Sequence, residues 1–174
     1  MPVDLRASFS HAALGASGVV SEQGFKACFP PAPVLSFART DRIDVAGATA
    51  FAGPDLRAIE GVFGHTLRRH VDISEAAVRE RALRTHHDAS RFNDAATAQQ
   101  TVDEAFAENQ VRIGGWLAAA RTGNLALHVH FDRTIGRVFR YDRQEFEPVC
   151  DADVILEKKP ALPQGYTVIT AFPQ

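Results

Sequence analysis

The sequence predicts an α+β fold, in which N-terminal helices pack on a twisted, mostly antiparallel sheet. From about residue 54 to residue 117, apolar residues recur every three or four positions, which is the period of an amphipathic helix. After the "RTGN" turn at 121–124 they recur at every second position, which is the period of a strand. Helices followed by strands, without alternation between the two, are typical of an α+β domain.

The composition is that of an ordinary globular domain with an irregular leading segment. The chain has 174 residues, of which 45% are hydrophobic, and its formal net charge is -2. This balance argues against a uniformly basic nucleic-acid binder but allows a local basic cleft. Residues 1–53 are rich in Ala, Gly, Ser and Pro and predict an arm or linker, so that residues 54–174 form the domain.

Neither a membrane span nor a Sec-type signal peptide is expected. No run of about 18 apolar residues occurs, and the opening "MPVDLRASFS" has an early acid and no long apolar core. The two cysteines, Cys28 and Cys150, make neither a disulfide framework nor a zinc site. We expect them to be partly buried free thiols.

Three helical stretches precede the predicted sheet. The first is "PDLRAIEGVFGHTLRRHV", where Gly61 and Gly64 allow a division into two short helices. The second is "ISEAAVRERALRTH", with Ser74 as its N-cap. After an expected loop, "HHDASRFND", Asp94 caps a long helix. The apolar face of that helix carries Val102, Ala105, Phe106, Ile113, Trp116 and Leu117.

Four strands are predicted to follow: "LALHVHF", "IGRVFRYD", "DADVILEKK" and "YTVITAF". Alternation along the last strand places Tyr166, Val168, Thr170 and Phe172 on one face.

The first of these strands carries His128 and His130 on one face, and two imidazoles at this spacing suit a metal pair. No matching trio of Asp, Glu or Cys accompanies them. A polar sheet face is therefore the preferred interpretation, and a place in a cleft stays open.

His70 and Arg81, eleven residues apart across a turn, could act together on a phosphate. A histidine gives and takes protons near neutral pH, and an arginine can hold a phosphate with two hydrogen bonds. Cleavage of RNA by its own 2′-hydroxyl needs a base, an acid and donors on the pentavalent phosphate. Spacing alone also fits a surface histidine or a helix C-cap at His70, and a half-exposed strand residue at Thr170.

Six segments, in this order and at this spacing, resemble a known family. They are "GHTLRRHV", "AVRERAL", "ASRFNDAATAQQTVDEAFAENQVRIGGWL", "IGRV", "DVILEKK" and "GYTVITAFP". Together they resemble the RNase A-like toxin domain found at the C-termini of bacterial contact-dependent growth inhibition proteins and other polymorphic toxins. The resemblance covers about residues 60–174 and leaves residues 1–53 outside.

The resemblance implies a metal-independent ribonuclease with the shape of pancreatic ribonuclease but without its disulfides. Such a domain needs no cofactor, is delivered by a specialised system into the cytoplasm of a target cell, and degrades RNA there. The resemblance further implies a cognate immunity protein that covers the active site of the toxin. We expect a monomer, which could be the C-terminal part of a larger secreted toxin.

The resemblance also implies which residues form the site. It matches His70 to the family's catalytic histidine, Arg81 to its arginine and Thr170 to its threonine. His65, in "GHT", is the candidate second proton carrier. Arg68 and Arg69 are candidate contacts to RNA phosphates, although a solvated helix face explains them equally well.

The sequence departs from the family at Phe172, where the family carries a tyrosine. The phenyl ring can still stack on a base, but it lacks the hydroxyl. Loss of a hydroxyl that donates to the transition-state phosphate would cost about 2–4 kcal/mol, or about 10²–10³ in rate. Phe172 therefore keeps open a degenerate module that binds RNA or an immunity protein without catalysis. A toxin of another chemistry, such as ADP-ribosyl transfer, is a separate alternative.

Overall fold

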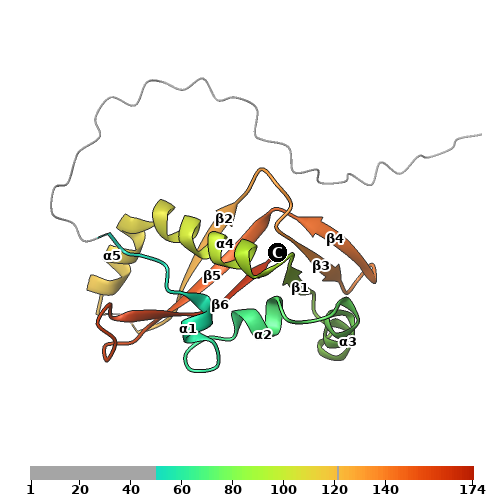
Figure 1. Ribbon diagram of the computed structural model, residues 1–174, viewed down its shortest axis with the longest axis horizontal. Coiled ribbons are helices and arrows are strands. Elements are labelled where there is room, and N and C mark those ends of the chain that lie inside the picture. The colour runs from blue at the N-terminus through green and yellow to red at the C-terminus, as the bar shows by residue number, and fades with distance from the viewer. Residues whose placement is uncertain (1–49, 121) are drawn as a thin grey trace, which may run out of the picture.

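The computed structural model describes residues 50–120 and 122–174, and it confirms the α+β class (Figure 1). The expected sheet is divided into two antiparallel sheets of three strands each, ordered β1-β3-β4 and β2-β5-β6. Most of the arm predicted over residues 1–53 lies outside the described residues. The elements are α1 (Leu56–Ile59), α2 (Thr66–His70), α3 (Glu75–Thr85), β1 (Ala89–Phe92), α4 (Ala95–Glu108), α5 (Gln110–Ala118), β2 (Leu125–His130), β3 (Gly136–Arg140), β4 (Glu145–Val149), β5 (Asp151–Lys158) and β6 (Tyr166–Pro173).

The predicted helix starts are confirmed, and one predicted helix is divided. Oγ of Ser74 accepts a hydrogen bond from the Ala77 amide, and the Asp94 carboxylate accepts one from the Thr97 amide. The long helix expected after Asp94 ends at Asn109, where α5 begins. The backbone of Asn109 leaves the helical region while its side-chain amide donates to the Ala105 carbonyl, an alternative bond that a short polar side chain offers.

Two short strands were not predicted. The expected loop over residues 86–94 contains β1, which pairs with β3 from Ala89↔Phe139 to Phe92↔Gly136. A strand of four residues is too short for its alternation to be recognised in the sequence. The strand β4 contains Pro148, which is depleted in strands, and it pairs with β3 in the same small sheet.

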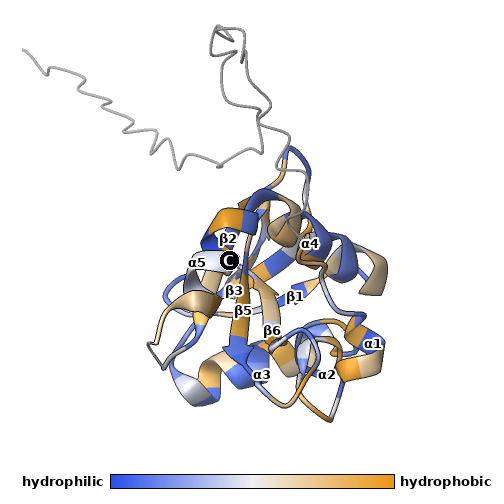
Figure 2. Cartoon of the chain, turned by 90° about the vertical axis from the view of Figure 1, so that its left-hand side faces the viewer, coloured by the Kyte–Doolittle hydropathy of each residue, from blue (hydrophilic) through white to orange (hydrophobic). Residues whose placement is uncertain are grey.

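The main core lies between the α4–α5 helices and one face of the β2-β5-β6 sheet. Phe106 and Ile113 contribute from the helices, and Leu127, Val154 and Val168 contribute from the strands. In Figure 2 the hydrophobic colour runs along β5, the central strand of this sheet. A smaller cluster under α3 consists of Val78, Ala82, Ala89 and Phe139.

Cys150 is buried, but the free thiol expected there is wrong, because its sulfur takes part in a disulfide. Cys28 lies outside the described residues.

The last strand, β6, contains an extra residue that changes which side chains share a face. Leu156 pairs with Val168, whereas the preceding Ile155 pairs with Thr170, so Ile169 is a β-bulge. Tyr166 and Val168, with Ala171 beyond the bulge, therefore belong to the core, while Thr170 and Phe172 lie on the opposite face of the sheet. The prediction that Thr170 and Phe172 share a face is confirmed. The prediction that Tyr166 and Val168 lie on that same face is wrong.

Candidate active site

The "GHT" segment connects the start of α2 to the edge strand β6 through hydrogen bonds. The His65 amide donates to the Ile169 carbonyl (3.0 Å), and the Ala171 amide donates to Oγ1 of the buried Thr66 (2.9 Å). Gly64 makes the approach possible, because a Cβ there would lie 2.8 Å from the Val168 carbonyl oxygen. These contacts lie on both sides of Thr170, and they fix α2 beside it.

A carboxylate from the residue that follows α1 holds the first turn of α2. Glu60 accepts hydrogen bonds from the amides of Leu67 (2.9 Å) and Arg68 (3.2 Å), while His65 provides no side-chain cap. These amides are among the four that a helix start leaves without internal partners. Glu60 thus orients a helix of only five residues that carries His70 at its last position.

The His70 ring is bonded to the backbone through one of its two nitrogens. Its Nδ1 lies 3.1 Å from the carbonyl oxygen of Ser90, and its ring lies 5.6 Å from the Phe172 ring between centroids. Because a carbonyl oxygen only accepts, Nδ1 carries the proton in this bond, and Nε2 of the neutral ring is an acceptor without a hydrogen-bond partner among the described residues. Burial, with the charges of Arg81 and Arg69, lowers the pKa of His70 to about 4 although the bond to Ser90 opposes the shift.

Arg81 and His70 share an acceptor, the carbonyl oxygen of Ser90. Arg81 Nη2 donates to the Ser90 carbonyl (3.0 Å) and Arg81 Nη1 donates to the Arg69 carbonyl (2.8 Å). One guanidinium therefore links α3 to β1 and to the end of α2. Burial lowers the pKa of Arg81, and the nearby charges of Arg69 and Arg84 act in the same direction.

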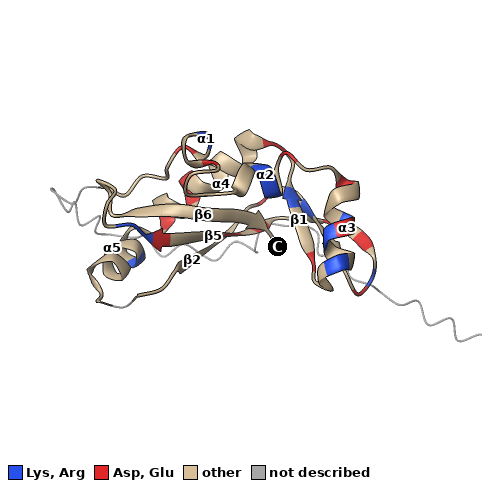
Figure 3. Cartoon of the chain, turned by 90° about the horizontal axis from the view of Figure 1, so that it is seen from below, with Lys and Arg blue, Asp and Glu red and all other residues tan. Residues whose placement is uncertain are grey.

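The remaining predicted basic residues lie around this pair. His65 is close enough for its charge to lower the pKa of His70, and burial together with Arg69 lowers the pKa of His65 itself. Arg68 and Arg69 are exposed on α2. In Figure 3 the Lys and Arg colour gathers on α2, β1 and α3. Basic residues are thus concentrated on these three elements.

Thr170 and Phe172 complete the set on β6. Oγ1 of Thr170 is buried and has no hydrogen-bond partner among the described residues. A buried hydroxyl without a partner is costly by about 1–3 kcal/mol. Phe172 is partly buried and contacts the His70 ring. The structure thus brings His70, Arg81 and Phe172 together, with Thr170 on the same strand face as Phe172.

Two residues that hold this site were missed in the sequence. Ser90 acts through its backbone carbonyl, which no side-chain pattern can indicate. Glu60 precedes α2 by six residues, beyond the spacing of a capping box.

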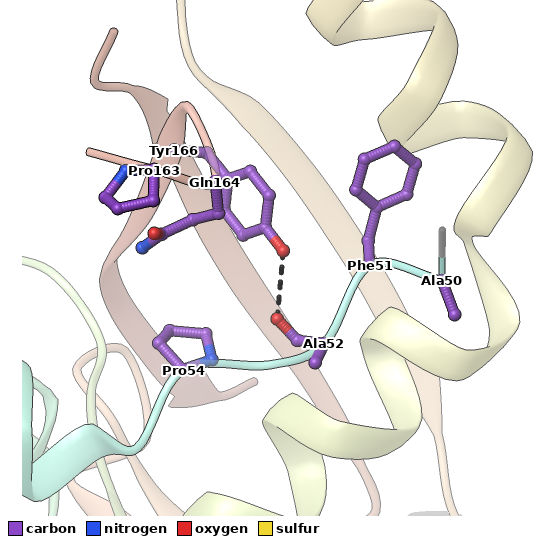
Figure 4. Close-up of a pocket in the computed structure, with 7 residues that line it drawn as sticks. All are labelled: Ala50, Phe51, Ala52, Pro54, Pro163, Gln164 and Tyr166. Carbon is purple, nitrogen blue, oxygen red and sulfur yellow. Dashed lines mark hydrogen bonds between the residues drawn. The ribbon is translucent and has the colours of Figure 1, made fainter. Parts of the chain in front are cut away.

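Other features of the described residues lie apart from the site. A pocket of about 480 Å³ is bounded by the stretch before α1 and the turn before β6, and the Tyr166 hydroxyl donates to the Ala52 carbonyl in it (Figure 4). Nothing in the described part of the chain groups three or more His, Cys, Asp or Glu side chains around a metal position. None of the helices within residues 50–120 and 122–174 has the length and hydropathy of a membrane span.

Comparison with known proteins decides the family. Residues 64–173 match the bacterial CdiA-CT RNase A domain. The chain belongs to this family of toxin domains. A comparison with curated proteins gave no match. Among solved structures, the CdiA-CT/CdiI complex from Y. kristensenii 33638 contains a chain that is 30% identical, with a TM-score of 0.59. The alignment covers 64% of the present chain and 99% of that one, so the CdiA-CT RNase A domain fold is confirmed.

Proposed function

We propose that this CdiA-CT domain is an endoribonuclease that cleaves RNA by metal-independent transesterification. The observation that carries the proposal is the bond between His70 Nδ1 and the Ser90 carbonyl, because it leaves Nε2 unprotonated beside Arg81 and Phe172. The lowered pKa of His70 makes it a base that is already deprotonated at neutral pH, rather than an acid.

In the proposed reaction Nε2 of His70 takes the proton from the ribose 2′-hydroxyl. The 2′-oxygen then bonds to phosphorus, the bond from phosphorus to the 5′-oxygen breaks, and a 2′,3′-cyclic phosphate remains. His65 is the candidate donor of the proton that the leaving 5′-oxygen requires. Because burial lowers the pKa of His65, we expect this donation to be favoured on the acidic side of neutrality.

We assign to Arg81 and Thr170 the stabilisation of the negative charge that develops on the pentavalent phosphate. Two of the five N–H groups of Arg81 are bonded to carbonyls, which leaves the others for phosphate oxygens. The unpartnered hydroxyl of Thr170 supplies a further donor. We assign Arg68 and Arg69 to flanking phosphates, and Phe172 to stacking on a base.

The biological setting follows from the family and from the neighbouring structure, which contains CdiI. We propose that residues 54–174 form the toxin domain, that a cognate immunity protein neutralises it, and that it acts in the cytoplasm of a target cell. Delivery of such domains by contact-dependent growth inhibition systems supports this setting.

The deciding experiment is incubation of total RNA with purified wild type and His70→Ala in EDTA, followed by analysis of the product ends. We expect wild type alone to release fragments with cyclic phosphate ends. His87→Ala, on the exposed loop after α3, is the matched control. The absence of cleavage by wild type would refute the proposal and favour the degenerate binding module, which the missing hydroxyl at Phe172 supports.

A further inference from the structure

The outer face of the β2-β5-β6 sheet carries a polar cluster that the proposed reaction does not use. It consists of His128, His130, Asp151 and Asp153. Phe172 is paired with Asp153 across β6 and β5, and Asp153 is paired with His128 across β5 and β2. His130 and Asp151 form the next pair on the same face. Figure 3 shows α1, α2 and α4 together on the other side of this sheet. The side chains of His128 and His130 are 55% and 48% exposed, so this face is accessible.

The four side chains hold one another in place. His128 Nδ1 lies 3.2 Å from Oδ1 of Asp153 and 2.9 Å from the side-chain Nε2 of Gln174. His130 Nδ1 lies 2.7 Å from Oδ1 of Asp151. The second oxygen of Asp153 makes no hydrogen bond within the described residues. A carboxylate has about four acceptor positions, so Asp153 retains capacity for a ligand.

The spacing of the strands decides what this cluster can do. Neighbouring strands lie about 4.8 Å apart, so the backbones of Phe172 and His128, two strands apart, are separated by about 10 Å. His70 contacts Phe172 from the side of α2, beyond the edge of the sheet. An acid and a base must each lie within about 3 Å of the atoms they serve. His128 is therefore too far from His70 to act on the same phosphate, but it can contact an adjacent part of the substrate.

The negative charge of this face indicates which part of an RNA substrate it can bind. The carboxylates of Asp151 and Asp153 repel phosphate, so the RNA backbone is a poor ligand for this face. A nucleobase is a good one, because its plane can stack on Phe172 or His128 and its amino group can donate to a carboxylate.

We propose that Phe172, Asp153 and His128 bind the nucleobase adjacent to the cleaved phosphate and select bases that carry an exocyclic amino group. The proposal rests on the ribonuclease function proposed above. It makes Asp153 a specificity residue, since uracil has no amino group to offer it.

The test uses oligodeoxynucleotides that contain a single ribonucleotide, with the base on either side of the cleaved bond varied between cytosine and uracil. We expect wild type to favour cytosine about tenfold in kcat/KM at one of the two positions, the gain from one hydrogen bond. Asp153→Asn should reduce this ratio to about twofold, and His128→Ala should raise KM with little change in kcat. Asp132→Asn and His87→Ala, both exposed, are the matched controls.

A second measurement separates this proposal from the ribonuclease proposal. His70→Ala is titrated with fully 2′-O-methylated oligonucleotides, which cannot be cleaved, and the preference for cytosine over uracil should persist in binding. If wild type does not cleave, the ribonuclease proposal fails while this binding assay still tests the base site. An unchanged base preference in Asp153→Asn and His128→Ala would overturn the base site. Variants that lose only their affinity for the immunity protein would overturn it as well, because the face would then be a protein interface.

Discussion

The partly buried His70 should make the stability of the fold depend on pH between about 4 and 6.5. Its pKa in the folded protein is about 4, whereas an unfolded chain returns it to 6.5. Between these values the unfolded state binds more protons, so the free energy of unfolding falls as the pH falls. If the whole pKa shift acts, the free energy of unfolding falls by about 2 kcal/mol from pH 7 to pH 5. Because the ring retains some contact with water, we expect a loss of about 1–2 kcal/mol.

The assay is urea unfolding of wild type and His70→Gln at pH 7 and pH 5. Gln cannot titrate, and its amide can still donate to the Ser90 carbonyl. We expect the pH change to cost wild type about 1–2 kcal/mol more than it costs the variant. His87→Gln, at an exposed position, should behave as wild type does. An equal loss in wild type and His70→Gln would show that His70 is not held neutral by burial, and the assignment of its base role would lose its support.

Three further outcomes concern activity. Phe172→Tyr should restore the missing donor and raise the cleavage rate by up to about 10²-fold. The control Phe146→Tyr, in the other sheet, should leave the rate unchanged. Equal rates for the two variants would contradict the role given to the hydroxyl. Thr170→Val should leave the free energy of unfolding unchanged or raise it, because the hydroxyl has no partner among the described residues. The same variant should slow cleavage at least tenfold. Urea denaturation and initial rates measure the two effects, and a loss of stability with an unchanged rate would contradict the assignment. Arg81→Lys should lower both the cleavage rate and the free energy of unfolding, the latter by about 1–3 kcal/mol. The reason is that an ammonium group cannot hold the Ser90 and Arg69 carbonyls together as the guanidinium does. A free energy of unfolding equal to that of an Arg57→Lys control would refute the bridging role.

The sequence predicted the elements that have a strong local signal. Ser74 and Asp94 mark helix starts because their side chains satisfy amides three residues away, which is a local requirement. The strand β1 has only four residues and owes its structure to β3, in which Phe139 pairs with Ala89 from far along the chain. Such a strand depends on a distant partner that no local pattern contains.

The site was predicted less completely than the fold, for similar reasons. His70 and Arg81 were matched through the family, but their common acceptor is a backbone carbonyl in β1, a segment expected from its sequence to be a loop. Strict alternation placed Tyr166 beside Thr170, because a bulge is a property of the pairing between two strands and not of one.

The bulge at Ile169 also has a consequence for how the domain can change over evolutionary time. It separates the residues of β6 that hold the fold, Tyr166, Val168 and Ala171, from Thr170 and Phe172, which take no part in the core cluster. Substitutions at positions 170 and 172 therefore leave the packing of α4 against the sheet intact. A lineage can exchange Phe172 for the tyrosine that the family resemblance implies there, or the reverse, and still produce a folded domain on which selection can act.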